Sequence, residues 1–330
     1  MTPAIVSLPP LRFRRRTLER VWGGRRLERV PGIRLPPALP IGESWEVSDR
    51  DEEPSIVAEG PLAGTPLRDL VARRRIELLG RARTTAGGRF PLLVKYLDTA
   101  QPLSIQVHPI TSDPTTGEEA KSEAWYFLHA EPESRVWLGL APGVTREEFT
   151  KAAGSSAIVP LVREWPVHAG EVAFVRGGTV HAIGPGVTVL EVQENSDTTH
   201  RLYDWDRAGV DGRPRPIHVE SALRATDYAE CHDGPRSAAW RDVAGGRRAM
   251  LTDCTLFELQ RVEVLTAQDD VTEDVAVMWA ILGGSGQLES AAGSVNLAPG
   301  DVWLVPACIG HHRIEASGSP LSAVRIATRP

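Results

Sequence analysis

The chain has 330 residues, which is long for a single average core and favours two packed units. Its formal net charge of −6, from 37 basic and 43 acidic side chains, gives no general attraction to nucleic acid or to an anionic membrane. The three cysteines, Cys231, Cys254 and Cys308, lie far apart in the sequence. Their spacing indicates neither a disulfide framework nor a thiolate zinc site, so a reducing compartment is expected.

The N-terminal segment "MTPAIVSLPPLRFRRRT" argues against secretion. Its basic cluster follows a short apolar run that prolines interrupt, which is the wrong order for a secretory signal. No run of 18 apolar residues occurs in the sequence, so no membrane span is expected. We therefore predict a cytoplasmic protein with no nucleic-acid or membrane partner.

The elements expected along the chain are mostly short strands, because 30 glycines and 26 prolines punctuate runs rich in Val, Ile, Leu and Trp. Helices are expected at Thr65 to Gly80, with Thr65 as the cap, and at Thr145 to Gly154, where Thr145 and Glu148 form a capping box. The expected strands are "SIQV", "EAWYFLHA", "EVAFV", "VTVLEVQ", "FELQRVEVL", "VAVMWAIL" and "DVWLVP".

Two segments repeat a pattern. Gly170 to Ile183 and Gly300 to Ile314 each have a glycine and an acid, an alternating apolar strand, a turn of small residues and a histidine eleven residues after the glycine. Chance similarity of two hairpin-like segments is the alternative. We favour two related β-barrels, because the spacing resembles the second motif of the cupin family, a closed jelly-roll barrel whose mouth commonly holds a metal.

Polar side chains gather on one face of the strand "SIQV". Ser104, Gln106 and His108 alternate with apolar residues, so they share a face. In isolation, a solvent-facing strand edge would explain this pattern better, but burial of the apolar face would turn these side chains into the barrel, where polar groups need partners. Glu123 opens the next strand and His181 follows a Gly-Gly turn. Two imidazoles, a carboxylate and an amide oxygen form a set suited to Zn²⁺ with one open position.

Several longer segments resemble the type I phosphomannose isomerases, and specifically the short bacterial form. They are "VWGG", "IGESWEVS", "FPLLVKYLDTAQPLSIQVHP", "KSEAWYFL" and "GGTVHAIGPGVTVLEVQENSDTTHRLYDWDR". The resemblance implies a cupin fold, one zinc ion per chain, and interconversion of D-mannose 6-phosphate and D-fructose 6-phosphate. It also implies that Gln106, His108, Glu123 and His181 are the zinc ligands.

The same resemblance assigns further roles. It implies that Lys95, Ser104 and Lys121 hold the phosphate, and that Glu191 and Arg201 lie at the reacting end of the sugar, where a proton moves and an enediolate is stabilised. Glu191 is the preferred proton carrier, while a zinc-bound water or a histidine stays open. The segment "GEEAKSE" departs from the family, because many members have Asn, His and Pro beside the lysine and glutamate.

The expected fold is mainly β, with two cupin-like jelly-roll barrels and a few short helices. Residues 1–235 form the catalytic domain with the metal site, and residues 236–330 form a metal-free cupin-like domain, because His311 has only Glu289 as a possible second ligand. The alternatives are a non-catalytic sugar-binding or regulatory cupin and a dioxygenase on the same barrel. The oligomeric state stays open between monomer and dimer.

Overall fold

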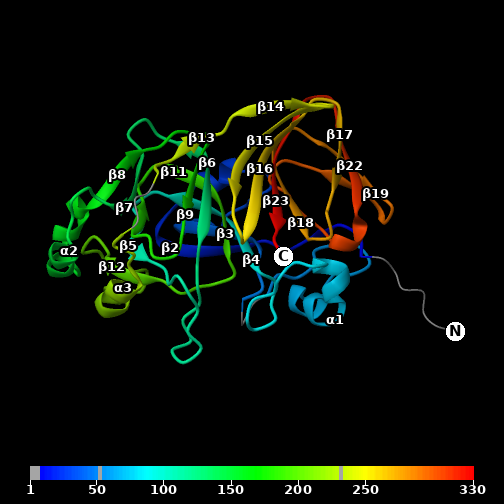
Figure 1. The fold of residues 1–330 in the computed structure, drawn as a ribbon. Helices are drawn as coiled ribbons and strands as arrows, with labels where there is room; N and C mark the ends of the chain where they lie inside the picture. The colour runs from blue at the N-terminus through cyan, green and yellow to red at the C-terminus, as the bar shows by residue number, and fades with distance from the viewer. Residues whose placement is uncertain (1–7, 51–53, 230–232) are drawn as a thin grey trace.

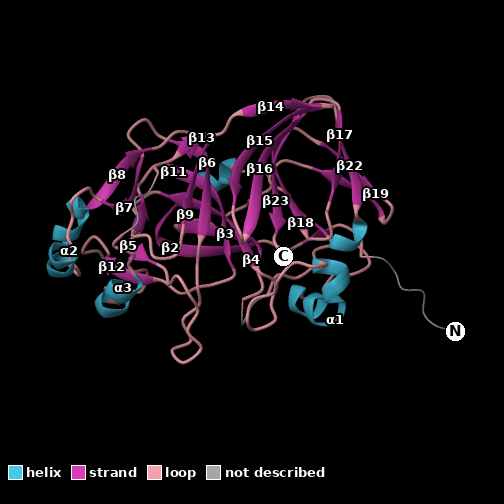
Figure 2. Ribbon diagram, viewed as in Figure 1, coloured by secondary structure: helices cyan, strands magenta, loops and turns pink. Residues whose placement is uncertain are grey.

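The structure is a computed structural model that describes residues 8–50, 54–229 and 233–330. It contains two barrels side by side, each built from two antiparallel sheets, with few helices (Figures 1 and 2). The predicted fold class is therefore confirmed. No helix of the described residues is long and apolar enough to cross a membrane.

The first barrel combines a seven-stranded and a five-stranded sheet. The seven-stranded sheet has the order β13 (Arg236–Ser237), β9 (Glu171–Val175), β6 (Glu123–Ala130), β11 (Val187–Glu194), β4 (Leu92–Thr99), β3 (Ile41–Val47) and β2 (Arg16–Gly24). The five-stranded sheet has the order β12 (His200–Tyr203), β5 (Ile105–Val107), β10 (His181–Ile183), β7 (Arg135–Leu140) and β8 (Val162–Pro166). The predicted strands "EAWYFLHA" and "EVAFV" have the predicted bounds.

The second barrel has the same layout. Its seven-stranded sheet has the order β1 (Leu11–Arg12), β21 (Val302–Val305), β18 (Val277–Gly283), β23 (Leu321–Thr328), β16 (Phe257–Val264), β15 (Gly246–Asp253) and β14 (Trp240–Val243). Its four-stranded sheet has the order β17 (Ala267–Val271), β22 (His311–Ala316), β19 (Gly286–Ser290) and β20 (Gly293–Leu297). Because β1 pairs with β21, the segment around Leu11 and Arg12 also belongs to this barrel. The division at residue 235 stays a prediction.

Helices lie at the margins of the barrels. The α-helices are α1 (Leu67–Leu79), α2 (Arg146–Ala152) and α3 (Val219–Ala225), and the 3₁₀ helices are η1 (Arg26–Arg29), η2 (Ser156–Leu161) and η3 (Ala307–Ile309). The capping box of Thr145 and Glu148 is confirmed at the start of α2. The prediction that Thr65 caps α1 is wrong, because Pro66 is the cap residue and no side chain caps this helix.

The central strands of the first barrel have two buried faces. On β4 and β11, Tyr96 and Leu190 point toward the second barrel and join the core that the two barrels share. Leu97 and Val189 point the other way and pack with Trp125 inside the first barrel. Alternation along a strand explains this division. As a result, β4 and β11 read as nearly continuous buried runs.

The repeated segments meet different surroundings. His181 lies at the edge of the Trp125 ring with 5.5 Å between ring centroids, and His312 lies at the edge of the Trp279 ring at 6.0 Å. His312 is fully buried, whereas the side chain of His311 is 67% exposed. The buried position beside the tryptophan is therefore held by His312, one residue after the predicted His311, although the turns before His181 and His311, residues 176–180 and 306–310, have the same length.

A guanidinium network surrounds His312. Its Nε2 lies 3.4 Å from Asp270 Oδ2, and that carboxylate accepts hydrogen bonds from Arg325 Nε at 2.7 Å and from Arg248 Nη1 at 2.9 Å. Positive charge that compensates the carboxylate is thus already present in this barrel. The absence of a metal from the second barrel stays a prediction. The two arginines give it a physical reason, because they already neutralise Asp270.

The core between the barrels predicts a large effect of one substitution. Leu190 is 0% exposed, so Leu190→Ala should lower the free energy of unfolding by about 2–5 kcal/mol, since a cavity would remain. Ile76 on α1 is 71% exposed, so Ile76→Ala should change it by less than about 0.5 kcal/mol. Urea denaturation of both variants would check this, and equal losses would contradict the assignment of this core.

Candidate active site

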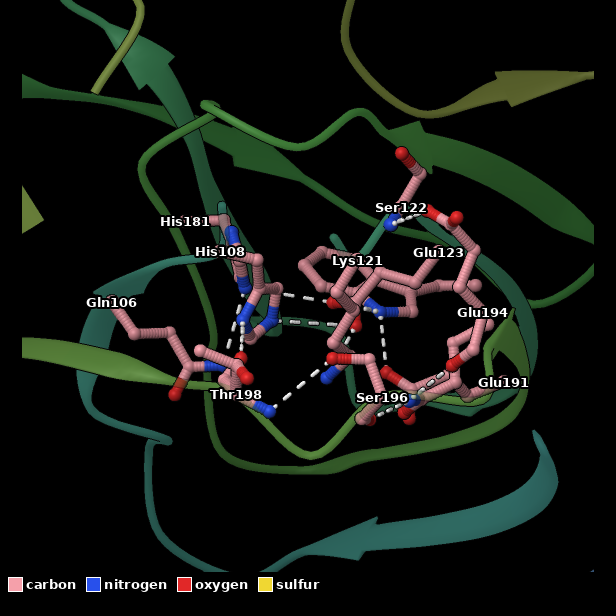
Figure 3. A network of polar contacts seen from close by, with 12 residues as sticks. Gln106, His108, Lys121, Ser122, Glu123, His181, Glu191, Glu194, Ser196 and Thr198 are labelled. Carbon is pink, nitrogen blue, oxygen red and sulfur yellow. Dashed lines mark hydrogen bonds and ion pairs between the residues drawn. The ribbon is translucent and has the colours of Figure 1, made fainter. Parts of the chain in front are cut away.

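Three side chains that can bind a metal meet between the two sheets of the first barrel. His108 follows β5, Glu123 opens β6 and His181 opens β10, and one ligand atom of each lies within 4.8 Å of the others. Nε2 of His108 and Nε2 of His181 each lie 3.5 Å from a carboxylate oxygen of Glu123. The pairing of His181 with Gln106 across β10 and β5 brings the two histidines together. Figure 3 shows both imidazoles directed toward Glu123.

Backbone carbonyls fix the orientation of both imidazoles. Nδ1 of His108 lies 2.8 Å from the carbonyl of Thr198, and Nδ1 of His181 lies 2.8 Å from the carbonyl of Thr179. A carbonyl only accepts hydrogen bonds, so each Nδ1 carries the proton and each Nε2 presents a lone pair to the shared space. Burial, with Lys121 nearby, lowers the pKa of His108 to about 3. The imidazole is therefore neutral at pH 7, as a metal ligand must be.

Gln106 completes the predicted set. Its Nε2 lies 3.2 Å from Nε2 of His181, and its Oε1 accepts a hydrogen bond from Ser104 Oγ at 3.0 Å. Rotating the amide by half a turn directs Oε1 at the shared space, and the hydroxyl of Ser104 can then accept from Nε2. The structure thus brings together all four predicted ligands, and the donor set of two imidazoles, a carboxylate and an amide fits a divalent metal.

A buried network links the candidate metal site to Glu191. Nε1 of Trp125 donates to Glu123 Oε1 at 3.1 Å and to Glu191 Oε1 at 3.0 Å. Lys121 Nζ lies 3.0 Å from Glu123 Oε2, and Lys95 Nζ lies 2.6 Å from Glu191 Oε2. Burial would raise the pKa of Glu123, but Lys121 lowers it well below its usual range. Figure 3 shows Lys121, Glu123 and Glu191 of this network.

Glu43 extends the network from β3. Its Oε1 accepts from Arg20 Nε at 2.7 Å, its Oε2 accepts from Trp45 Nε1 at 2.6 Å, and Lys95 Nζ lies 3.8 Å away. Burial would raise the pKa of Glu43, but Lys95 and Arg20 outweigh burial and lower it to about 2. The sequence prediction missed Glu43 as a site residue. The alternation of Glu43 and Trp45 in "IGESWEVS" was the signal, because it places both side chains on one face.

The lysines carry another signal that the sequence prediction missed. The chain has 34 arginines and only three lysines, and two of these, Lys95 and Lys121, lie in this network. Both are buried, with exposed fractions of 8% and 6%. A lysine can shift its pKa and lose its charge, which an arginine does not do in proteins. The presence of lysine at these two positions, in a chain so rich in arginine, favours a role that depends on the ammonium group.

A cavity of about 330 Å³ opens beside the network. The predicted residues that line it are Lys95, Ser104, Gln106, Lys121, Glu191 and Arg201. Arg201 lies opposite Gln106 in the pairing of β12 with β5, and it forms no ion pair with any described residue. Burial and the neighbouring Arg215 lower the pKa of Arg201. The cavity therefore contains a guanidinium group without an ion-pair partner, and Gln106 of the candidate metal site also lines it.

This fold and this site define a cupin-fold enzyme with a candidate metal centre beside a polar cavity. Residues 11–141 match the family model described as "Phosphomannose isomerase type I, catalytic domain". The chain is 31% identical to the mannose-6-phosphate isomerase of Streptococcus mutans over 301 residues, which are 90% of this chain and 92% of the relative. The chain belongs to the type I phosphomannose isomerases.

Solved structures agree with this membership. The mannose 6-phosphate isomerase from Bacillus subtilis superimposes with a TM-score of 0.87 and 27% identity, over 97% of this chain and 99% of the relative. A mannose 6-phosphate isomerase solved with zinc bound shares the fold, with a TM-score of 0.73 and 17% identity, over 98% of this chain and 100% of the relative.

The metal site can be tested by a matched pair of histidine variants. Wild-type protein loaded with zinc and desalted should hold about one ion per chain, the stoichiometry of a single site. His181→Ala should lose that ion, whereas His312→Ala, which alters the counterpart histidine of the second barrel, should keep it. Mass spectrometry of the bound metal would measure the content. Loss of zinc from His312→Ala, with no loss from His181→Ala, would show that the second barrel holds the metal and would contradict the assignment.

The burial of Lys95 predicts an unusual titration. Burial lowers the pKa of Lys95 to about 8, although Glu43 works against the shift. In metal-free protein carrying ¹³C-labelled lysine, one of only three lysine signals should titrate near pH 8 and disappear in Lys95→Met. Unfolded protein should titrate near about 10.4. Between these values the unfolded chain binds more protons at this group, so its contribution to stability rises with pH.

If the lysine signal that Lys95→Met removes titrates with an ordinary midpoint near about pH 10.4, the proposed burial of the Lys95 ammonium group would be contradicted.

Proposed function

We propose that this protein interconverts D-mannose 6-phosphate and D-fructose 6-phosphate as a zinc-dependent aldose–ketose isomerase, through an enediolate. The observation that carries the proposal is the buried His108, Glu123 and His181 group, which Trp125 links to Glu191 at the wall of a charged cavity. The names of its relatives support the same substrate pair.

Four residues would hold the zinc ion: Gln106, His108, Glu123 and His181. A bound zinc would polarise the oxygens of the sugar as a Lewis acid. The zinc-bound relative supports the choice of metal. The chain contributes by fixing both imidazole tautomers through the carbonyls of Thr198 and Thr179 and by holding Glu123 with Lys121.

Glu191 is the proposed proton carrier. Isomerisation removes a proton from one carbon of the sugar and returns it to the neighbouring carbon. Glu191 Oε1 is held by Trp125, and Oε2 is paired with Lys95, so the carboxylate has a fixed position at the cavity wall. It would accept the proton from C2 of mannose 6-phosphate and deliver it to C1, while the hydroxyl proton of O2 moves to O1. In the reverse direction the proton would move from C1 to C2.

Arg201 is the proposed stabiliser of the enediolate. Its guanidinium is half-buried and has no carboxylate partner among the described residues, so its charge is available to the cavity. A fixed cation at the position where negative charge develops lowers the barrier without reorganisation. Lys95, Ser104 and Lys121 are the proposed contacts of the phosphorylated substrate, and Lys121 keeps N–H donors for it beyond the one that faces Glu123.

The division of labour between the barrels is part of the proposal. Residues 1–235 would carry catalysis, and residues 236–330 would form a barrel without a metal. A sugar-binding protein without catalysis is the alternative, and the complete set of Glu191, Arg201 and metal ligands speaks against it. The cytoplasmic location and the lack of nucleic-acid or membrane partners stay predictions.

A coupled assay of fructose 6-phosphate conversion tests the proposal. Chelation should abolish activity and Zn²⁺ should restore it. Arg201→Ala should lower kcat by about 10²-fold or more, by analogy with removal of a charge-stabilising donor. Lys121→Ala should chiefly raise KM, with some loss of kcat, because binding of remote groups also orients the sugar.

Zinc content should survive in Arg201→Ala, since Arg201 is not a proposed ligand. Full activity in a verified metal-free preparation would contradict the proposed zinc dependence. Parental turnover in a folded Arg201→Ala protein would remove this residue from the mechanism.

A further inference from the structure

A second cavity lies between the two barrels, away from the candidate active site. It measures about 380 Å³ and is lined from both sides. The first barrel and the segment that contains η1 contribute Arg29, Tyr96 and Thr188, and the second barrel contributes Arg261 and Leu282. It occupies the junction at which the two barrels stand side by side in Figure 1. The sequence prediction assigns no role to any of these residues.

Two buried hydroxyls line this cavity without a hydrogen-bond partner. Tyr96 is 0% exposed and Thr188 is 4% exposed, and neither Tyr96 Oη nor Thr188 Oγ1 has a partner among the described residues. Leaving a buried hydroxyl unpaired is costly, so such groups normally have a protein, water or ligand partner. Both side chains lie on the face of β4 and β11 that points to the second barrel. The cavity is the space from which a partner can reach them.

The charge around the cavity is one-sided. Three arginines line it, Arg26, Arg29 and Arg261, and none of its described lining residues is acidic. Arg26 is paired with Asp98 and Glu131, but Arg29 and Arg261 form no ion pair with a described residue. In a chain with a net charge of −6, a pocket lined by two guanidinium groups outside ion pairs and by no carboxylate favours an anion, and Asp98 offsets only part of the charge of Arg29.

Arg261 is held rigidly in spite of its missing counter-ion. It donates from Nε to Tyr126 Oη at 2.9 Å and from Nη1 to the carbonyls of Val262 and Ala323 at 2.9 Å each. It also donates from Nη2 to Ser322 Oγ. Neutral acceptors satisfy its hydrogen bonds and leave its charge in place. Tyr126, which accepts from Arg261, keeps its own hydroxyl proton for a ligand.

We propose that this cavity binds a small organic oxyanion with an apolar body. The anionic group would lie near Arg29 and Arg261, where the hydroxyls of Tyr96 and Thr188 can donate to it. The apolar body would pack on Val30, Pro31, Leu128, Ile281 and Leu282, which also line the space. A carboxylate, a phosphate ester and a sulfonate share this chemistry.

The position of the cavity connects it with the candidate active site. Tyr96 follows Lys95 on β4, and the two side chains lie on opposite faces of the strand. In the same sheet Glu191 pairs with Lys95, and Leu190 pairs with Tyr96. A ligand in the cavity therefore contacts the reverse side of the strands that carry the Lys95–Glu191 ion pair. Occupancy of the cavity would act on the kinetic constants of the enzyme without competing for the substrate cavity.

Calorimetric titration with 2-naphthalenesulfonate tests the proposal. This probe has an anionic group and an apolar body but does not resemble a sugar phosphate. Saturable binding of one molecule per chain is expected for the full-length protein. Inorganic sulfate, which lacks the apolar body, and 2-naphthol, which lacks the anionic group, should each bind at least about tenfold more weakly. Sulfate loses the burial of apolar surface, and 2-naphthol loses the charged hydrogen bonds.

Three variants locate the binding. Arg29→Gln and Tyr96→Phe should each weaken probe binding by roughly tenfold, because each loses one hydrogen bond, or one charge, to the anion. Arg29 is exposed, so Arg29→Gln should fold normally and keep the activity of the parent protein. Arg201→Gln, which alters the other cavity, should bind the probe as the parent does. Weak or non-saturable binding, or binding that falls in Arg201→Gln and not in Arg29→Gln, would overturn the proposal.

Discussion

Ionised side chains inside a protein must be paired, because each unpaired one costs several kcal/mol, of the order of the whole stability of a domain. Lys95, Lys121, Glu123 and Glu191 are all less than 10% exposed, and the first barrel resolves their burial by connecting them. Lys121 faces Glu123 and Lys95 faces Glu191. The indole N–H of Trp125 joins the two carboxylates. The candidate site depends on this arrangement, since removal of one partner leaves the other charge buried alone.

The same sheet explains why the second barrel is needed. Strands β4 and β11 carry the charged network on one face, so their other face must be covered by apolar surface to keep the sheet in place. The second barrel supplies that surface. Its own interior has a counterpart of the histidine and tryptophan pair, but Arg248 and Arg325 compensate the carboxylate of Asp270 there. Both barrels thus compensate buried carboxylates, the first with lysines beside a candidate metal site and the second with arginines.

The sequence predicted the parts of this arrangement that depend on short-range alternation. The strands that carry Glu123 and Glu191 and the shared face of Ser104, Gln106 and His108 follow from a two-residue period, and the structure brings the four predicted ligands together. It could not predict contacts that depend on register between distant strands. The hydrogen bonds of Trp125 to two carboxylates and the approach of Glu43 to Lys95 are of this kind.

Two smaller errors also have physical causes. The histidine beside the tryptophan of the second barrel is His312 and not the predicted His311, because neighbouring residues on a strand face opposite sides and spacing alone does not show which of two adjacent histidines is buried. The cap of α1 was misplaced because Pro66, with a fixed backbone angle and no N–H to satisfy, replaces a side-chain cap. The cavity between the barrels has no sequence signal, since its lining comes from segments as distant as Arg29 and Ser322.

The central claim is that two imidazoles, a carboxylate and an amide of the first barrel bind a metal ion. X-ray absorption spectroscopy at the zinc edge of the zinc-loaded, full-length protein tests it most directly. The account predicts only nitrogen and oxygen neighbours, at about 2.0–2.2 Å, with the outer-shell scattering of two imidazoles. In His181→Ala that outer-shell scattering should fall or the zinc should be lost. A sulfur neighbour at about 2.3 Å, or a spectrum without imidazole scattering, would contradict the account.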